Sequence, residues 1–89
     1  MESIWKETLR VDDTQKVELP VGAKILCIQE QDDKPQIWFI TPKVENVEKE
    51  TRTFFIYGTG HPHDAIIGEY VWTFQLRGGL LVFHVFEDK

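Results

Sequence analysis

The sequence has a single cysteine and no long apolar run. Because Cys27 is the only cysteine among 89 residues, no disulfide can form within the chain, and a reducing compartment suits it. No stretch approaches the roughly 20 apolar residues that a membrane-spanning helix needs. Residues 1–6 have neither the basic start nor the apolar stretch of a signal peptide. We therefore expect a cytoplasmic protein with no membrane partner.

Positive charge is also scarce. Lys and Arg number 10 against 15 Asp and Glu, which gives a formal net charge of −5. A protein that grips a DNA or RNA polymer gains affinity by releasing counterions from many phosphates, and this balance argues against such a partner. A small anion needs only a local pocket, so the composition leaves an anionic small molecule open.

No helix-period apolar stripe of useful length is present, and the pattern is that of short strands. Runs of β-branched and aromatic residues recur between turn signals. The expected strands are 4–10, 15–19, 24–30, 36–41, 51–57, 69–76 and 80–86. This spacing predicts one domain, residues 1–89, that is all-β: a small antiparallel β-sandwich or barrel of about seven strands.

Three connections carry separate expectations. Residues 31–35 read as a polar hairpin loop, and Arg77-Gly78-Gly79 reads as a tight hairpin turn. Residues 42–50 combine two valines three positions apart with several charges. We expect a solvated loop there, and a single helical turn is the alternative.

Several expected strands are apolar on both faces. An antiparallel sheet with one solvated face should alternate apolar and polar residues, but 24–30, 36–41 and 80–86 do not. Two apolar faces in so small a domain leave one that needs a cover. We expect a second subunit to provide it, in a homo-oligomer such as a dimer or tetramer. The alternative is a closed barrel whose apolar exterior lies under residues 42–50.

Residues with chemical capability gather in one stretch, Tyr57-Gly58-Thr59-Gly60-His61-Pro62-His63-Asp64, which we call the glycine–histidine loop. A Gly-Thr-Gly turn can point backbone N–H groups into one concavity that binds an anion. The glycines let a ligand approach the backbone closely, and imidazoles add hydrogen bonds. The alternative is a tight turn with no ligand, since no Rossmann or P-loop motif is present.

The loop does not make a convincing metal or catalytic site. His61, His63 and Asp64 would need a third metal ligand from a distant residue such as His84, so we expect no metal and no cofactor. No nucleophile–base pair or paired carboxylates can be recognised, so we expect no enzyme. A phosphodiesterase that uses His61 and His63 is the alternative.

Aromatic and cationic side chains outside the loop extend the candidate site. Nucleobases stack on flat rings, and Tyr57 directly precedes the turn. Arginine pairs with phosphate through two hydrogen bonds. Trp72 reads instead as core, and His84 as a core or interface histidine. The candidate ligand-binding residues are Tyr57, Gly58, Thr59, Gly60, His61, Pro62, His63, Arg52 and Trp5.

The chain resembles a family of small proteins of tailed bacteriophages. The likeness runs nearly end to end, and two motifs carry most of it: Tyr57-Gly58-Thr59-Gly60-His61-Pro62 and Phe83-His84-Val85-Phe86-Glu87. The series also includes Ile4-Trp5-Lys6, 20–26, Ile37-Trp38-Phe39 and Arg52-Thr53-Phe54. Such proteins are similar to phage sponges that sequester the cyclic nucleotide signals of bacterial anti-phage (CBASS) immunity.

The resemblance implies an immune-evasion protein of the infected host cytoplasm. It would bind a cyclic oligonucleotide, such as a cyclic dinucleotide, between subunits and would not cleave it. The alternative is a phage protein–protein interaction module, either a host-factor inhibitor or a structural component, with no small-molecule ligand.

Overall fold

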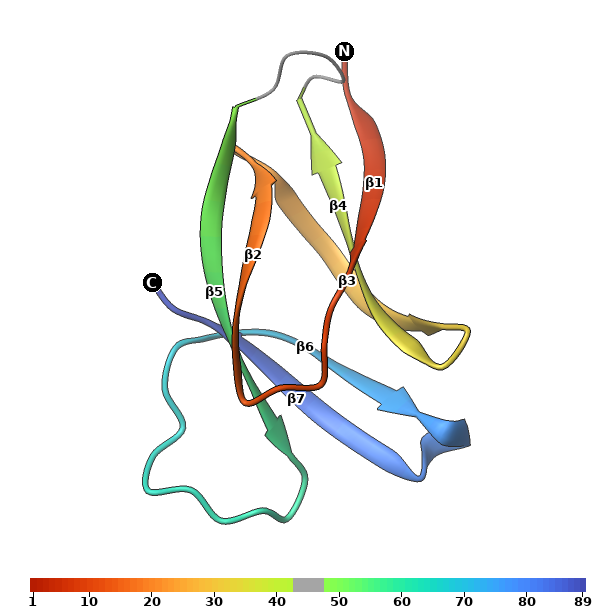
Figure 1. The fold of residues 1–89 in the computed structure, drawn as a ribbon, viewed down its shortest axis with the longest axis vertical. Coiled ribbons are helices and arrows are strands. Elements are labelled where there is room, and N and C mark those ends of the chain that lie inside the picture. Colours follow the sequence, from red (N-terminus) through yellow and green to blue (C-terminus); the bar gives the residue numbers. More distant parts are fainter. Residues whose placement is uncertain (43–47) are drawn as a thin grey trace.

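The computed structural model describes residues 1–42 and 48–89 and confirms a mainly β fold (Figure 1). Each expected strand is present, with its ends shifted by a few residues at most. The strands are β1 (Ser3–Thr8), β2 (Thr14–Pro20), β3 (Lys24–Gln31), β4 (Lys34–Thr41), β5 (Lys49–Gly58), β6 (Glu69–Leu76) and β7 (Leu81–Glu87). A short 3₁₀ turn, η1 (Arg77–Gly79), joins the last two. Among the described residues, no helix is long and apolar enough to cross a membrane.

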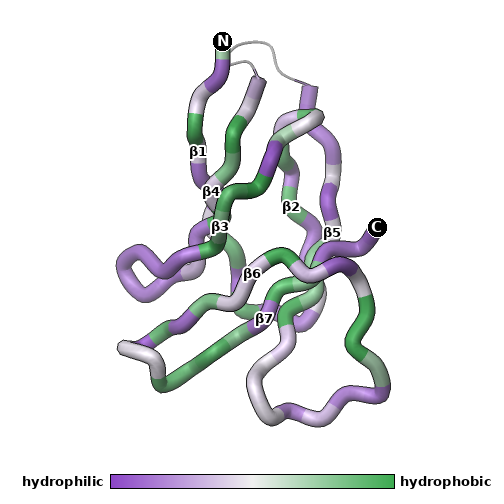
Figure 2. Tube along the Cα trace, turned by 180° about the vertical axis from the view of Figure 1, so that it is seen from behind, coloured by the Kyte–Doolittle hydropathy of each residue, from purple (hydrophilic) through white to green (hydrophobic). Residues whose placement is uncertain are grey.

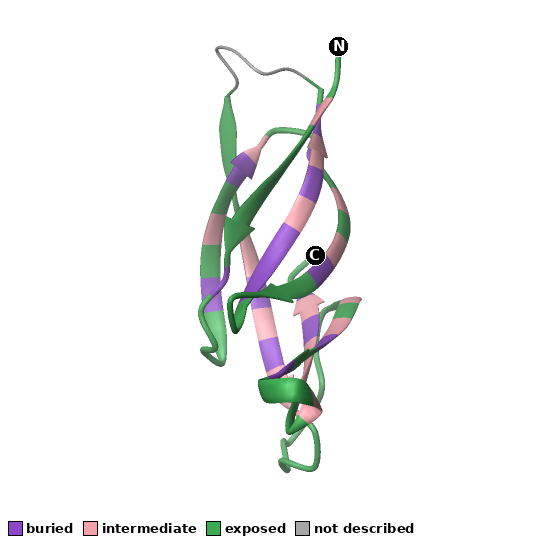
Figure 3. Ribbon diagram, turned by 90° about the vertical axis from the view of Figure 1, so that its right-hand side faces the viewer, coloured by how far each residue is buried: buried purple, intermediate pink, exposed green. Residues whose placement is uncertain are grey.

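The strands form two antiparallel sheets. Sheet A has the order β1-β4-β3 and sheet B has the order β2-β5-β7-β6. The inward faces of both sheets bury the core, which Figure 3 shows as bands along the central strands. Its members are Leu9, Leu19, Ala23, Ile28, Ile37, Phe39, Phe54, Ile56, Phe74, Leu76 and Val85. β1 lies at the edge of sheet A and is exposed over nearly its whole length.

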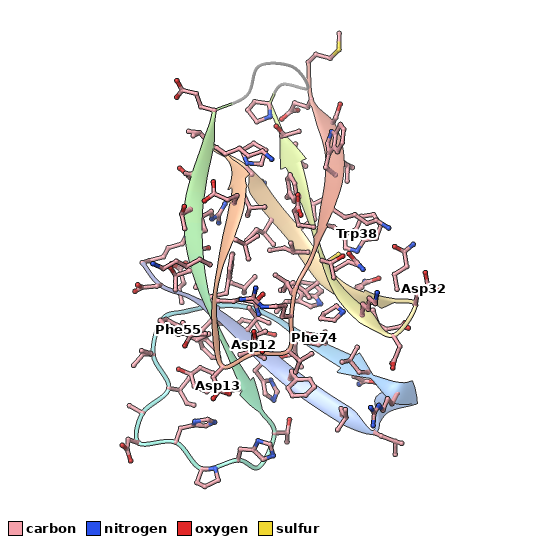
Figure 4. The ribbon with its side chains drawn as sticks, viewed as in Figure 1. Asp12, Asp13, Asp32, Trp38, Phe55 and Phe74 are labelled. Atoms are coloured by element: carbon pink, nitrogen blue, oxygen red, sulfur yellow. The ribbon has the colours of Figure 1, made fainter. Side chains whose placement is uncertain are left out.

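Two connections differ from the sequence expectation. The β3–β4 hairpin closes with only Asp32 and Asp33 between the paired residues Gln31 and Lys34, not with a five-residue loop. Both aspartates have positive φ, 55° and 60°, which matches the twist of a two-residue hairpin and is tolerated better by Asp than by most residues. Figure 4 shows Asp32 at this tip.

The expected 42–50 loop is shorter than predicted. Lys49 and Glu50 already belong to β5, where they pair with Pro20 and Leu19 of β2. Backbone pairing with β2 therefore extends the strand beyond the point where apolar residues end. The rest of that expectation, for residues 43–47, lies outside the described residues.

The prediction that Trp72 belongs to the core was wrong. β6 carries a bulge, because Tyr70 and Trp72 face the consecutive residues Phe86 and Val85 of β7. Phe74 is buried in the core, but Trp72 is 39% exposed and lines a cleft. Alternation assigns a side chain to one face of a sheet, but it does not show whether the opposite sheet covers that position.

The outer face of sheet B shows what lies beside one of the strands that are apolar on both faces. Tyr57 of β5, His84 of β7 and Thr73 of β6 occupy consecutive register positions across this face. The chain between β5 and β6 returns past them, and the backbone N–H of Ile67 donates to the Tyr57 hydroxyl at 3.2 Å. The apolar second face of β7 therefore lies beside the protein's own loop. The second subunit stays a prediction.

Candidate functional site

The glycine–histidine loop forms one wall of a cleft against the outer face of sheet B. We call it the loop cleft; its volume is about 330 Å³. The loop lies between the end of β5 and the start of β6 in Figure 1, and Figure 2 shows its polar stretch giving way to apolar residues before β6. The lining residues are Tyr57, Gly58, Thr59, Gly60, His61, His63, Ile66, Tyr70, His84 and Phe86. The loop cleft thus brings together all three histidines of the sequence.

The backbone of the turn uses part of its hydrogen-bonding capacity internally. The Thr59 amide donates to the Val82 carbonyl at 3.1 Å, and the His61 amide donates to the Gly58 carbonyl at 3.2 Å. Within the described residues the Gly60 amide makes no hydrogen bond, and Gly60 has a φ of +82°. The turn therefore presents fewer amides than an anion-binding nest built from the whole Gly-Thr-Gly segment would have.

The two loop histidines are exposed and held by different contacts. The His61 ring lies over Gly58 so closely that a Cβ on Gly58 would be 2.7 Å from Nδ1. The His63 ring meets the Tyr57 ring edge-on, with centroids 4.7 Å apart and planes at 78°. Tyr57 also contacts Phe86 edge-on at 5.6 Å. Both imidazoles therefore stand at the cleft, whereas Pro62 between them does not line it.

His84 is a member of this site that the sequence did not reveal. Its Nε2 lies 2.7 Å from the Thr59 hydroxyl, and its Nδ1 lies 3.0 Å from the Thr73 hydroxyl. The Thr59 hydroxyl also contacts the Val82 carbonyl at 3.1 Å, and Thr73 contacts the Tyr70 hydroxyl at 2.8 Å. Sequence alone gave no register for β5, β6 and β7, and only the register places His84 beside Thr59 and Thr73.

Two of the sequence-predicted ligand residues lie elsewhere. Trp5 is on the edge strand β1 and is 51% exposed, beside Phe39 rather than the loop. Arg52 lies in a second, larger cleft of about 780 Å³ between the first halves of β3 and β6. Neither residue lines the loop cleft.

Arg52 also commits three of its five N–H groups to the protein. Its Nε and Nη2 donate to the two carboxylate oxygens of Glu87 at 2.6 and 2.8 Å, and Nη1 donates to the Ala23 carbonyl at 2.8 Å. The hydrogen-bonded Glu87 carboxylate raises the pKa of Arg52 above its ordinary value, although burial opposes this; the charge of Glu50 adds to the increase. Both side chains are largely buried, so this pair is a structural tie between β5 and β7.

The charge of the loop cleft is unusual for a site that would hold an anion. Among the described residues that line it, none is Lys, Arg, Asp or Glu. No group of three or more His, Cys, Asp or Glu in the described part of the chain is arranged to hold a metal ion. The polar groups of the loop cleft are imidazoles, hydroxyls and one amide. Imidazoles and hydroxyls can donate or accept hydrogen bonds according to the ligand, and the amide N–H can donate.

The fold and the loop cleft together define a small all-β protein with a concave site of aromatic rings, hydroxyls and imidazoles. The chain belongs to the family described as Domain of unknown function (DUF7352), whose model matches residues 1–89. No curated protein and no solved structure matches the chain. The family description carries no activity, so the phage origin and the ligand stay predictions.

Proposed function

We propose that the protein binds a cyclic oligonucleotide, such as a cyclic dinucleotide, at the loop cleft and sequesters it without cleaving it. The observation that carries the proposal is the gathering of His61, His63 and His84 around one concavity that also presents the rings of Tyr57 and Tyr70. Aromatic rings give a nucleobase a stacking surface worth roughly 1–3 kcal/mol per base. Imidazole N–H groups and the Gly60 amide supply hydrogen-bond donors for phosphate oxygens.

The size of the loop cleft supports a site shared by two chains. A volume of about 330 Å³ is at the low end of small-molecule sites, which span roughly 300–1,000 Å³. A cyclic dinucleotide has two nucleotide halves related by symmetry or near-symmetry. Two copies of the cleft in a twofold dimer would each hold one half. In this proposal the phage protein acts in the host cytoplasm as a homo-oligomer, and its immune-evasion (anti-CBASS) role follows from removing the signal.

Binding without cleavage is consistent with the contacts of Thr59. This hydroxyl lies beside His84, an arrangement that the sequence alone could not show. However, the Thr59 hydroxyl can also donate to the Val82 carbonyl, and a proton directed there is not directed to the imidazole. Thr59 in that arrangement is a hydrogen-bonding group rather than an activated nucleophile.

Calorimetry with a panel of cyclic di- and trinucleotides tests the proposal. We expect saturable heat with at least one member at micromolar protein, and loss of about tenfold or more in affinity in the His61→Ala variant. The bound nucleotide should be recovered intact after heat denaturation of the protein. A linear product would instead indicate the phosphodiesterase alternative, and no heat with any member would overturn the proposal.

The interaction-module alternative makes the opposite prediction for the same variant. Its binding surface would be an exposed apolar face, for example that of Trp5 and Ile4 on β1, which are 51% and 63% exposed. In that case His61→Ala would leave binding to a host protein unchanged. A pull-down with both wild type and His61→Ala, with and without the nucleotide panel, separates the two functions.

A further inference from the structure

A cleft that binds phosphate without a Lys or Arg needs another source of positive charge. The ionisable side chains that line the loop cleft are three histidines and two tyrosines. Imidazole is the group among these whose ordinary pKa, about 6.5, lies near neutral pH. The question is therefore which imidazole is built to carry a proton when the anion is present.

His84 differs from the other two because both its ring nitrogens have hydroxyl partners. Consider the neutral ring with hydrogen on Nε2. Nε2–H donates to Thr59, whose hydroxyl donates to the Val82 carbonyl, a group that can only accept. On the other side, Nδ1 accepts from the Thr73 hydroxyl, which in turn accepts from the Tyr70 hydroxyl. Every hydrogen bond in this series then has one donor and one acceptor, and the Tyr70 hydroxyl hydrogen is directed to Thr73.

A proton added to Nδ1 reverses the direction of the hydrogen bonds on the Nδ1 side of His84 only. Nδ1–H then donates to Thr73, and the Thr73 hydroxyl turns to donate to the Tyr70 oxygen. The Nε2 side is unchanged. The Tyr70 hydroxyl hydrogen is released from the chain, and Tyr70 lines the loop cleft with 56% of its surface exposed. Protonation therefore costs no internal hydrogen bond, and it adds both a positive charge and a hydrogen-bond donor to the cleft.

We propose that His84 is the cation of the loop cleft and takes up a proton when a phosphate-bearing ligand binds, through the chain Thr59–His84–Thr73–Tyr70. This inference rests on the proposed function, and it names how that site holds negative charge. Thr73 is a positioning residue, because its hydroxyl accepts from the protonated Nδ1–H and then donates to the Tyr70 oxygen.

Among the described residues that line the loop cleft, no negative charge favours a protonated His84 in the absence of ligand, so proton uptake depends on the ligand. Tyr57 faces it from β5 and Thr73 faces it from β6, where the Tyr70 hydroxyl contacts Thr73, and the loop adds His61 and His63. Among the described residues lining the cleft there is no carboxylate that could hold the imidazolium permanently. His61 and His63 are exposed, and within the described residues neither ring has a hydroxyl partner. The test must therefore control for a general effect of these two histidines.

The test is calorimetry of the best-binding cyclic nucleotide in two buffers that differ in ionisation enthalpy, across about pH 6 to about pH 8. We expect net proton uptake near neutral pH. Affinity should rise by up to about tenfold per unit as the pH falls within this range, since the bound state holds more protons than the free state. His84→Gln, which replaces the imidazole with a hydrogen-bonding amide that cannot take a proton, should bind more weakly and lose the uptake.

Two further variants keep the inference falsifiable if His84→Gln does not fold. Thr73→Val preserves the imidazole but removes the acceptor for Nδ1–H, so proton uptake should fall. The double variant His61→Gln/His63→Gln should bind more weakly but retain the uptake. Tight binding with no uptake, or uptake lost only in the double variant, would overturn the role of His84 and leave the proposed function standing. Absence of binding at every pH would overturn both.

Discussion

Gly58 sets the shape of the loop cleft at a single position. A methyl group there would lie 2.7 Å from Nδ1 and 2.9 Å from Cε1 of His61, so the imidazole could not keep its place. No positive φ is required at Gly58, which means that an alanine is acceptable to the backbone. The glycine is therefore needed for the position of a neighbouring ring rather than for a turn.

This gives a prediction for Gly58→Ala. Because the His61 ring is exposed and can swing away, the free energy of unfolding should change by less than about 1 kcal/mol. Affinity for the cyclic nucleotide should nevertheless fall about as far as in His61→Ala, roughly tenfold. Calorimetry and a thermal melt measure the two quantities separately.

A double-mutant cycle provides the control. If Gly58→Ala acts only by displacing the imidazole, it should have no further effect on affinity in a His61→Ala background. Additive losses from the two substitutions would contradict the proposed contact and would show that Gly58 contributes through the backbone.

Arg52 gives the second prediction at this scale, and it concerns stability. Its substitution by alanine would leave the buried Glu87 carboxylate and the Ala23 carbonyl without the donors they now have. We expect a loss of about 3 kcal/mol in the free energy of unfolding, measured by urea denaturation. Arg10→Ala removes the exposed ion pair with Asp12 and should change stability by less than about 0.5 kcal/mol. Equal effects would show that the Arg52 pair is not a structural tie.

At the scale of elements, the hairpin tip of β3 and β4 is tied to the turn between β6 and β7. The Asp33 carboxylate accepts from the Arg77 amide at 3.0 Å, while Asp32 makes no side-chain hydrogen bond within the described residues. Both aspartates have positive φ and so carry similar backbone strain. Comparing substitutions of Asp32 and Asp33 therefore distinguishes the effect of the hydrogen bond to Arg77 from the effect of the turn conformation.

Asp33→Ala should destabilise the protein more than Asp32→Ala by about 1 kcal/mol, since only the first loses the bond to Arg77. Chemical denaturation of the two variants gives the difference directly. A larger loss in Asp32→Ala would mean that the turn conformation, rather than the link between the hairpins, dominates at this tip.

Sequence reasoning found every strand because the β-branched and aromatic runs were well separated by turn residues. It misjudged connections where pairing, not composition, decides the boundary: Lys49 and Glu50 extend β5 because β2 is there to pair with them. It also placed Trp72 in the core, because neither the bulge at Tyr70 nor the limits of sheet A can be read from alternation.

The candidate site shows the same division. The loop residues from Tyr57 to Gly60 were found because glycines and a hydroxyl adjoin a strand, and they do line one cleft. Arg52 was selected for its chemistry, although its partner Glu87 is distant in sequence and only the fold joins them. His84 was missed for the same reason: its hydroxyl partners come from the turn after β5 and from β6.

At the scale of the whole molecule, the expectation of an oligomer now has a narrower basis. The outer face of β7 borders the loop. Among the described residues, the exposed large hydrophobic side chains are spread over β1, the larger cleft, the loop at Ile66 and Ile67, and the turn at Leu80. Native mass spectrometry with added cyclic dinucleotide should show an even number of chains and one ligand per pair of chains. A monomer that binds one ligand would contradict the shared site while leaving the loop cleft as its location.

The central claim is that the loop cleft holds the nucleotide, and a map of backbone and imidazole NMR shifts during a titration tests it most directly. We predict that the largest changes fall on Gly58 to His63, Thr73 and His84. Changes confined to the larger cleft around Lys24 and Trp72, or to the outer face of sheet A around Trp38 (Figure 4), would contradict it.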